Sequence, residues 1–513
     1  MAVSRFVRLF KVSFCCAVFS LVAKAVTAAD PPRPNVLFAI SDDQSWMHVG
    51  AYGDVATQTP AFDRVAREGV LFRYAFTACP SCAPSRSALL TGQEIYRLEE
   101  GGVLIGHLPN KFATFTLALE KTGYELASTG KTWGPGKLDR GGWKRSPTGR
   151  AFNDVKLADA PPGTSTRDYA ANFESFLAER QRARPFFFWY GASEPHQRYD
   201  VGAWKKAGKK LEQARLPGCL PDDPVTRGEI LDYCLEIEHF DRHLARMLAA
   251  LERDGLLENT IVIVTSDHGN PLPRAKCNLY DAGIRVPLAV RWPRGIPGGR
   301  VAGGLVSLTD IAPTLLDMAG LPAPAEMTGR SLWPLLTAPA GSEVTPGREF
   351  VVTAIERHTI CRRDGVGYPM RAIRTQRWSY IRNYEPARWP AGDPDFVGKA
   401  QGFYGDIDRG ASKSFMVSHS DTDGVRKLFR LAFGRRPAEE LYDLEADADQ
   451  LVNLADVPEH AATKALLVQQ LAAYLRETDD PRQRGETPWD TYPYYSTGIF
   501  ANPAWRVEGR ALR

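Results

Sequence analysis

The sequence predicts a doubly wound α/β domain followed by a smaller domain of sheet and helix. Continuous apolar runs of strand length, typical of strands buried on both faces of a parallel sheet, occur at residues 34–40, 185–190 and 259–266. Amphipathic helical patterns alternate with these runs, at residues 59–69, 113–122 and 226–254. A stretch rich in Pro, Gly, Ala and Ser at residues 337–347 then marks a domain boundary.

The chain begins with a pattern typical of a signal peptide, which we place at residues 1–29. Arg5, Arg8 and Lys11 precede an apolar run at residues 12–23 that is short for a membrane span, and small residues follow it. We therefore expect an exported protein, periplasmic or secreted, without stable insertion in a membrane. Cleavage also removes Lys24, so the formal charge of +4 falls to about zero, which does not indicate a nucleic-acid-binding protein.

Three further segments follow the leader. We expect a catalytic domain at residues 33–340 and a smaller C-terminal domain at residues 348–480. In the smaller domain, residues 370–384 and 441–444 have strand patterns, and residues 460–478 have the pattern of a helix lying on that sheet. Residues 481–513 are rich in Pro, Trp and Tyr, have no clean periodicity, and are left as an irregular tail.

Polar residues follow several of the predicted strands at the point where each strand ends. They are Asp42 and Asp43, Lys131, His196, and Asp267 with His268, and Lys276 comes after a further loop. In an open α/β sheet the loops at the carboxyl ends of the strands converge on one crevice, so we expect these side chains to gather there. Adjacent buried carboxylates need a cationic partner, and hard oxygen ligands favour a divalent cation. A solvated turn, or an isolated surface Lys or His, is the alternative for each residue taken singly.

The segment from Cys79 to Gly92 contains the most distinctive pattern in the chain. A thiol at Cys82 precedes Pro84, Ser85, Arg86 and an apolar helical run that ends in Thr-Gly. The start of a helix favours an anion. The residues alone leave three interpretations: an incidental buried Cys, a redox or metal pair of Cys79 with Cys82, or a Cys82 that is modified to become a nucleophile.

The pattern Cys-x-Pro-Ser-Arg-x-x-x-Leu-Thr-Gly at residues 82–92 resembles the signature of the type I sulfatases. The resemblance extends from about residue 35 to residue 456. It implies an alkaline-phosphatase-like fold, with a mixed sheet covered by helices on both faces and a smaller C-terminal α+β domain with an antiparallel sheet. It also implies that a formylglycine-generating enzyme oxidises Cys82 to Cα-formylglycine during maturation.

The resemblance assigns roles to the residues at the strand ends. The positions that bind one divalent cation, usually Ca²⁺, match Asp42, Asp43, the modified Cys82, Asp267 and His268, although many members have Asn in place of His268. The catalytic positions match Cys82, Arg86, Lys131, His196 and Lys276. In the implied reaction the hydrated formylglycine attacks sulfur, displaces the alcohol or amine and then expels sulfate. Lys131 and Lys276 would contact the sulfate, Arg86 would hold the diol, and His196 would contact sulfate or protonate the leaving group.

One position departs from the family pattern. The family commonly has a His two residues after the Lys of the Gly-Lys turn, where it helps to deprotonate the diol, and this chain has Trp133 there. We expect His358, His107 or solvent to take that role.

Features of the C-terminal part resemble the heparan N-sulfatase (sulfamidase) branch, among them Gly367-Tyr368-Pro369-Met370-Arg371 and residues 440–444. The implied substrate is N-sulfoglucosamine of heparan sulfate or heparin, with Glu356, Arg357 and His358 as candidate sugar contacts. A polar strand end at a domain junction is the alternative for these three residues. An O-sulfatase acting on another glycan or on an aryl sulfate is the alternative for the substrate.

Two other classes of protein remain open from the sequence. A phosphoester hydrolase of the same superfamily would use Ser or Thr and usually two zinc ions with several His ligands, whereas few of the nine His residues are clustered here. A redox or carbohydrate-binding protein would instead contain a disulfide between Cys79 and Cys82.

Overall fold

The computed structural model describes residues 33–341, 347–395 and 403–495. The predicted leader and residues 496–513 of the predicted tail lie outside the described residues, so export stays a prediction. Within the described part of the chain, none of the helices combines the length and the apolar character that crossing a membrane requires.

The larger sheet is mixed, as the family resemblance implies. Its strands run in the order β4-β3-β5-β1-β6-β8-β2-β7, and β9 pairs with β2. The bounds are β1 Asn35–Ser41, β2 Val70–Phe76, β3 Glu125–Gly130, β4 Arg150–Ala151, β5 Phe186–Gly191, β6 Thr260–Ser266, β7 Arg285–Val286, β8 Leu288–Arg291 and β9 Arg300–Ser307. The strands β3, β5, β1 and β6 are parallel, whereas β8 is antiparallel to both β6 and β2.

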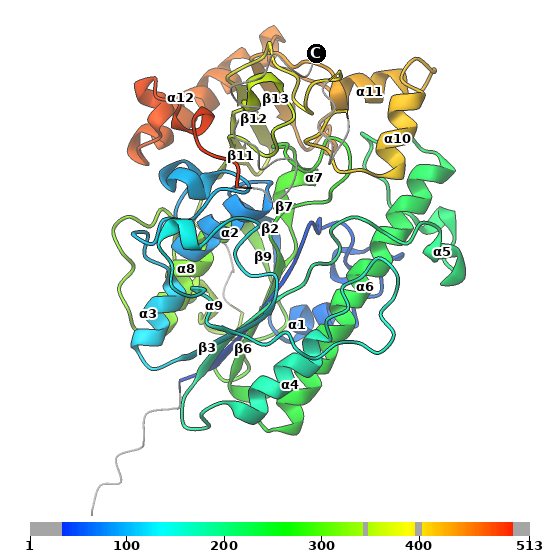
Figure 1. Ribbon diagram of the computed structural model, residues 1–513. Coiled ribbons are helices and arrows are strands. Elements are labelled where there is room, and N and C mark those ends of the chain that lie inside the picture. The colour runs from blue at the N-terminus through cyan, green and yellow to red at the C-terminus, as the bar shows by residue number, and fades with distance from the viewer. Residues whose placement is uncertain (1–32, 342–346, 396–402, 496–513) are drawn as a thin grey trace, which may run out of the picture. The chain divides into compact units, whose positions relative to one another are not determined.

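Helices cover both faces of this sheet (Figure 1). One face carries α2 (Cys82–Thr91), α3 (Phe115–Lys121), α8 (Ile311–Met318) and α9 (Trp333–Leu336), and the other carries α1 (Pro60–Glu68), α4 (Tyr169–Glu179) and α6 (Pro224–Arg253). The central strand β1 shows why both faces need a cover. Val36, Phe38 and Ile40 pack into one hydrophobic core, and Leu37 and Ala39 pack into the other. This alternation explains the continuous apolar run in the sequence.

The smaller sheet is antiparallel, as expected, in the order β10-β11-β12-β13. Its strands are β10 Phe350–Ile355, β11 Met370–Thr375, β12 Trp378–Asn383 and β13 Glu439–Asp443. The helix α12 (Ala461–Glu477) packs on it through Leu467, Leu471 and Leu475 (Figure 1). The region predicted as strand at residues 370–384 is therefore a hairpin of two strands. The same hydrophobic core includes Phe76 and Leu305 of the larger sheet.

The remaining helices are short and lie in the connections. They are α5 (Ala203–Lys206), α7 (Asp281–Ile284), α10 (Ala411–Ser418) and α11 (Arg426–Phe433).

Candidate active site

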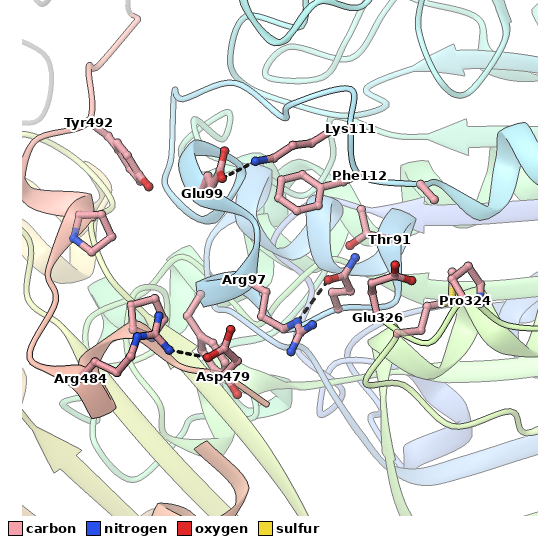
Figure 2. Close-up of a pocket in the computed structure, with 16 residues that line it drawn as sticks. Thr91, Arg97, Glu99, Lys111, Phe112, Pro324, Glu326, Asp479, Arg484 and Tyr492 are labelled. Atoms are coloured by element: carbon pink, nitrogen blue, oxygen red, sulfur yellow. Dashed lines mark hydrogen bonds and ion pairs between the residues drawn. The ribbon is translucent and has the colours of Figure 1, made fainter. Parts of the chain in front are cut away.

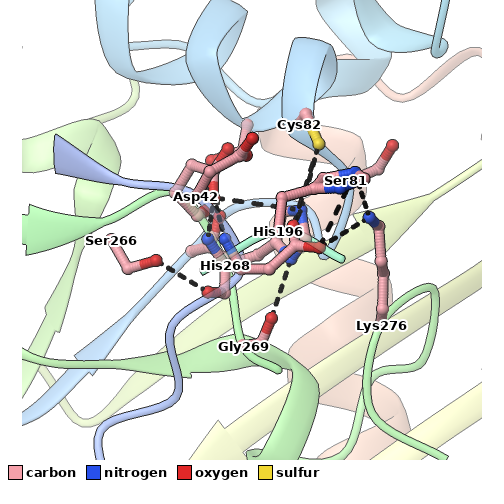
Figure 3. Close-up of polar contacts among 12 residues, drawn as sticks. Asp42, Ser81, Cys82, His196, Ser266, His268, Gly269 and Lys276 are labelled. Atoms are coloured by element: carbon pink, nitrogen blue, oxygen red, sulfur yellow. Dashed lines mark hydrogen bonds and ion pairs between the residues drawn. The ribbon is translucent and has the colours of Figure 1, made fainter. Parts of the chain in front are cut away.

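The strand ends meet as expected, and they bring the predicted side chains together (Figure 3). Asp42 and Asp43 follow β1, Lys131 follows β3, and Asp267 and His268 follow β6. Backbone hydrogen bonds join these loops: the Asp267 N–H donates to the Ser41 carbonyl at 3.3 Å, and the Asp43 N–H donates to Asp267 Oδ1 at 3.1 Å. The carboxylates are thus placed by the sheet itself.

Cys82 is the first residue of α2, and its thiol points into this cluster (Figure 3). Its Sγ lies 3.4 Å from His268 Nε2 and 3.9 Å from Asp43 Oδ1. Every residue of α2 is buried, and Gly92 ends the helix with a φ of 66°, in the left-handed region that favours glycine. The residues of the signature therefore place one side chain at a fixed point in the site.

Arg86, one turn into α2, is fully buried and joins three loops. Its Nε donates to Asp267 Oδ2 at 2.9 Å, and its Nη1 donates to the carbonyls of Lys131 and Thr132, each at 2.9 Å. Its Nη2 lies 3.5 Å from Asp42 Oδ1. The planar guanidinium orients two carboxylates and the Lys131 loop at once.

Two lysines approach the paired aspartates from different loops. Lys131 Nζ lies 2.5 Å from Asp42 Oδ2, and Lys276 Nζ lies 2.7 Å from Asp43 Oδ2. Lys276 Nζ also lies 3.2 Å from His196 Nε2. His196 is on the rim of the cluster, with a side chain that is 35% exposed, whereas Lys276 is buried. Of these basic side chains, Lys131 and His196 are the ones that reach the open side of the cluster.

These neighbours control the charge of the first two carboxylates. Burial alone would raise the pKa of Asp43, but the charges of Lys276, His196 and His268 outweigh it and hold that pKa well below its ordinary value. Burial raises the pKa of Asp42 despite the nearby lysine. The surroundings therefore favour the ionised form of Asp43, whereas burial disfavours the ionised form of Asp42.

The second pair shows the same competition. Burial opposes ionisation of Asp267, yet Arg86 and His268 lower its pKa below the ordinary value. Burial would lower the pKa of His268, but Asp267 and Asp43 raise it well above its ordinary value. In the protein without a metal ion, the His268 imidazolium therefore supplies positive charge where the carboxylates meet, with Nε2 at 3.0 Å from Asp43 Oδ1.

The donor atoms fit a divalent cation. One ligand atom from each of Asp42, Cys82, Asp267 and His268 lies within 4.8 Å of the others, and Asp43, Cys82 and His196 form a second such group. Among the described residues, the buried Asp42 Oδ1 has no hydrogen-bond donor. This buried carboxylate oxygen, with only the Arg86 Nη2 contact at 3.5 Å, has lone pairs that could bind a cation.

The structure also brings in a residue that the sequence analysis missed. Asp408 comes from the loop before α10, and its Oδ2 lies 2.7 Å from Lys276 Nζ. Lys276 is therefore shared between Asp43 and Asp408. Because Asp408 does not follow a predicted strand, no pattern in the sequence pointed to it.

The three candidate sugar-binding residues have different surroundings. His358 is closest to the cluster: its Nδ1 lies 2.8 Å from Ser81 Oγ, and burial lowers its pKa to about 4. Glu356 is buried and pairs with two arginines, and Arg357 donates to backbone carbonyls of residues 489–493. Substrate binding by these residues stays a prediction, and Glu356 and Arg357 have internal partners in this structure.

Trp133 is buried in the hydrophobic core that also includes Cys82. Its Nε1 donates to Ser87 Oγ at 2.7 Å, and the ring packs in the core beneath α2. His107, one proposed replacement for the expected His, instead pairs with Glu100 at 2.6 Å. His358, next to Ser81, is the candidate that lies nearer to Cys82.

The cysteines do not form the alternative redox pair. All six cysteines of the described residues are buried free thiols, Cys79 and Cys82 among them. Burial raises the pKa of Cys79 well above its ordinary value, so this neighbour is a packed, unreactive thiol.

A groove leads from the surface to the cluster. It has a volume of about 430 Å³, and its lining includes Asp42, Lys131, Glu194, His196 and Arg198. We call it the active-site groove. A second cavity of about 430 Å³ lies between residues 91–113 and 479–492, and its lining includes Arg97, Lys111, Phe112 and Arg484 (Figure 2). It contains none of the predicted site residues.

Comparisons with known proteins identify relatives of this chain. A family model described as "Sulfatase" matches residues 34–321, and a second, "N-sulphoglucosamine sulphohydrolase, C-terminal", matches residues 275–390. An ulvan-active sulfatase of Formosa agariphila is 29% identical over 457 residues, which cover 88% of this chain and 82% of that protein. The human N-sulphoglucosamine sulphohydrolase is 28% identical over 506 residues, which cover 91% and 94%.

The fold is also that of a solved structure described as a complex with its substrate D-glucosamine-2-N,6-O-disulfate. The two superpose with a TM-score of 0.63 at 18% identity, over 89% of this chain and all of the other. At this identity the likeness shows the fold alone.

Proposed function

The chain belongs to the sulfatase family and hydrolyses sulfate esters or sulfamates, and from this premise we propose that its substrate is N-sulfoglucosamine in a sulfated saccharide such as heparan sulfate. The match of residues 275–390 to the C-terminal model of N-sulphoglucosamine sulphohydrolase is the observation that carries this proposal. That region contains both Lys276 of the site and the strands β10 to β12.

The nucleophile in this proposal is Cα-formylglycine, made from Cys82 by a formylglycine-generating enzyme. Cys82 is buried in the folded protein, so its oxidation has to precede folding. Asp42, Asp43, Asp267 and His268 would hold the cation together with the modified residue. Three carboxylates among the ligands favour a hard ion, and Ca²⁺ is our assignment.

When bound, the cation and the hydrated formylglycine would supply the hydroxyl nucleophile for sulfuryl transfer. The side chains of the protein position this chemistry. The Lys131 and Lys276 ammonium groups, each within hydrogen-bond distance of a metal-binding aspartate, would attract the sulfate oxygens. Arg86 would keep Asp267 and Asp42 in place.

In this proposal His196 transfers a proton to the leaving group. It is the most exposed side chain of the cluster and lines the active-site groove. Its Nδ1 lies 2.7 Å from the Gln197 carbonyl and its Nε2 lies 3.2 Å from Lys276 Nζ, so the ring is held with one nitrogen beside the expected sulfate position. In a sulfamate the group that receives the proton is the glucosamine nitrogen.

The experiment is a measurement of sulfate release from a panel of saccharides by protein co-expressed with a formylglycine-generating enzyme in the presence of Ca²⁺. The panel contains N-sulfoglucosamine, glucosamine 6-O-sulfate, a sulfated ulvan oligosaccharide and an aryl sulfate. We expect the highest kcat/KM with N-sulfoglucosamine. Cys82→Ala should lower the rate at least about a thousandfold. Cys219→Ala removes another buried thiol outside the cluster and should keep the activity.

An O-sulfatase acting on a different glycan is the second candidate, supported by the similarity to an ulvan-active sulfatase over 88% of the chain. Release of sulfate from O-sulfated members of the panel only would refute the N-sulfate assignment and support this candidate. Full activity of Cys82→Ala would refute the nucleophile.

A further inference from the structure

A larger groove adjoins the active-site groove. It has a volume of about 890 Å³ and is lined by three segments: residues 197–205 with α5, the first turns of α6, and residues 409–414 at the start of α10. We call it the outer groove. The three helices lie side by side (Figure 1). Gln197 and Arg198 line both grooves, so the two adjoin at these residues.

Two walls of the outer groove start at the catalytic cluster. His196 and Asp408 both contact Lys276 Nζ, at 3.2 and 2.7 Å. The next residues along the chain, Gln197 and Arg409, line the outer groove. The chain segments that hold His196 and Asp408 beside Lys276 thus continue directly into the walls of the outer groove.

The outer groove is held in shape by one buried carboxylate. Glu229 of α6 accepts hydrogen bonds from Gln197 Nε2 at 3.0 Å, from the Ala411 N–H at 2.9 Å and from the Ser412 N–H at 2.7 Å. All three segments of the lining meet at this side chain. The groove is thus preorganised, which lowers the entropic cost of binding a ligand.

An aromatic and aliphatic surface forms part of the lining. The Trp204 indole lies against Gly228 of α6, where an added Cβ would be 2.9 Å from Trp204 Nε1. The backbone N–H of Trp204 donates to Asp232 Oδ1 at 2.8 Å, which fixes α5 on α6. Val201 and Val225 also line the groove and are 83% and 42% exposed. Exposed apolar surface next to a site is typical of a ligand-binding groove, and the apolar face of a sugar ring suits it.

Cations surround this surface. Arg198, Lys205 and Arg409 are exposed residues of the lining, and Lys205 Nζ lies 5.4 Å from the centre of the Trp204 ring. The two acids of the lining, Glu229 and Asp232, accept hydrogen bonds from the backbone, and three cationic side chains stand against these two carboxylates. Charge complementarity therefore favours an anionic ligand with an apolar face.

We propose that the outer groove is a second saccharide subsite, which binds the acidic sugar unit joined to the one whose sulfate is removed. This inference rests on the proposed function, because it extends the same substrate. The ring of the acidic unit lies on Trp204 and the valines, and its carboxylate or sulfate group pairs with Arg198.

The test compares kcat/KM for N-sulfoglucosamine with kcat/KM for a heparin-derived tetrasaccharide that ends in N-sulfoglucosamine. We expect the tetrasaccharide to be preferred. Trp204→Ala should lower the ratio of tetrasaccharide to monosaccharide kcat/KM about tenfold. Arg198→Ala should lower this ratio about threefold and make it less sensitive to the salt concentration. Trp204→Phe should retain most of the preference. Arg150→Ala, an exposed arginine on β4 outside both grooves, is the control for loss of positive charge.

A ratio that neither Trp204→Ala nor Arg198→Ala changes would overturn the subsite. Arg198 is exposed, so its variant stays informative even if Trp204→Ala does not fold. Binding to Cys82→Ala protein, measured by calorimetry, separates this inference from the proposed function. The subsite is supported, even when no N-sulfate is released, if the acidic tetrasaccharide binds more tightly than N-sulfoglucosamine and Trp204→Ala abolishes this difference. Equal binding of a neutral tetrasaccharide would overturn it.

Discussion

The substitution Glu356→Gln separates a structural role from a sugar-binding role for a residue that the sequence placed among the substrate contacts. Glu356 Oε1 accepts from Arg371 Nη2 at 2.7 Å and from Arg482 Nε at 2.9 Å, and Oε2 accepts from Arg482 Nη2 at 2.6 Å. Its side chain is 2% exposed. Glu356→Gln removes the negative charge that offsets the Arg371 and Arg482 guanidinium groups in this buried environment.

The magnitude follows from the partners that remain. Removing one partner of a buried ion pair costs about 3–5 kcal/mol. Arg371 keeps two contacts with Asp480, at 2.8 and 3.1 Å, and the Gln amide oxygen still accepts a hydrogen bond. We therefore expect Glu356→Gln to lower the free energy of unfolding by the smaller amount of about 2–3 kcal/mol.

The assay is urea unfolding followed by tryptophan fluorescence, at a fixed Ca²⁺ concentration, combined with KM for the best saccharide of the panel. We expect a lower urea midpoint with KM within about twofold of the original value. Glu459→Gln, at an exposed carboxylate on the C-terminal side, should change stability by less than about 0.5 kcal/mol. A raised KM with unchanged stability would refute the structural role and support the sugar contact.

Three further predictions concern the cation, the departure from the family pattern and pH. Chelation should lower sulfate release at least about a hundredfold, and Ca²⁺ should restore it and raise the melting temperature; full activity after chelation would exclude the cation. Trp133→Phe removes the hydrogen bond to Ser87 and should cost about 1 kcal/mol of stability while keeping activity, whereas a complete loss of activity would assign Trp133 a direct role. Burial, with a contribution from Arg242, lowers the pKa of His239 to about 4 in the folded protein. As pH falls from about 6.5 to 4, the unfolded chain therefore binds a proton at His239 that the folded chain does not bind. The free energy of unfolding decreases over this pH range. His239→Gln should reduce this loss by about 2 kcal/mol in unfolding measured at each pH, and an unchanged pH dependence would contradict it.

The sequence predicted those parts of the fold and site that follow from local pattern and strand direction. The runs that became β1, β5 and β6 are buried on both faces and are therefore apolar throughout. Because parallel strands end at the same edge of a sheet, the sequence predicted that Asp42 and Asp267 lie close together. The structure confirms this: the Asp43 N–H donates to Asp267, and Arg86 contacts both Asp42 and Asp267.

Other features depend on tertiary contacts that no local pattern encodes. Asp408 reaches Lys276 from a loop more than a hundred residues later in the chain, and it does not follow a predicted strand. The turn between β11 and β12 lacks the Gly or Pro that would have marked it, so the strand pattern at residues 370–384 gave no boundary between the two strands. The internal partners of Glu356 include Arg482, from a segment that the sequence left unassigned.

The most direct test of the central claim is the mass of the peptide that contains residue 82, isolated from catalytically active protein. We expect this peptide to carry an aldehyde in place of the Cys82 thiol, and the modified fraction to rise in proportion to sulfate release across preparations. Active protein with an unmodified Cys82 thiol, or with a disulfide between Cys79 and Cys82, would contradict the formylglycine mechanism.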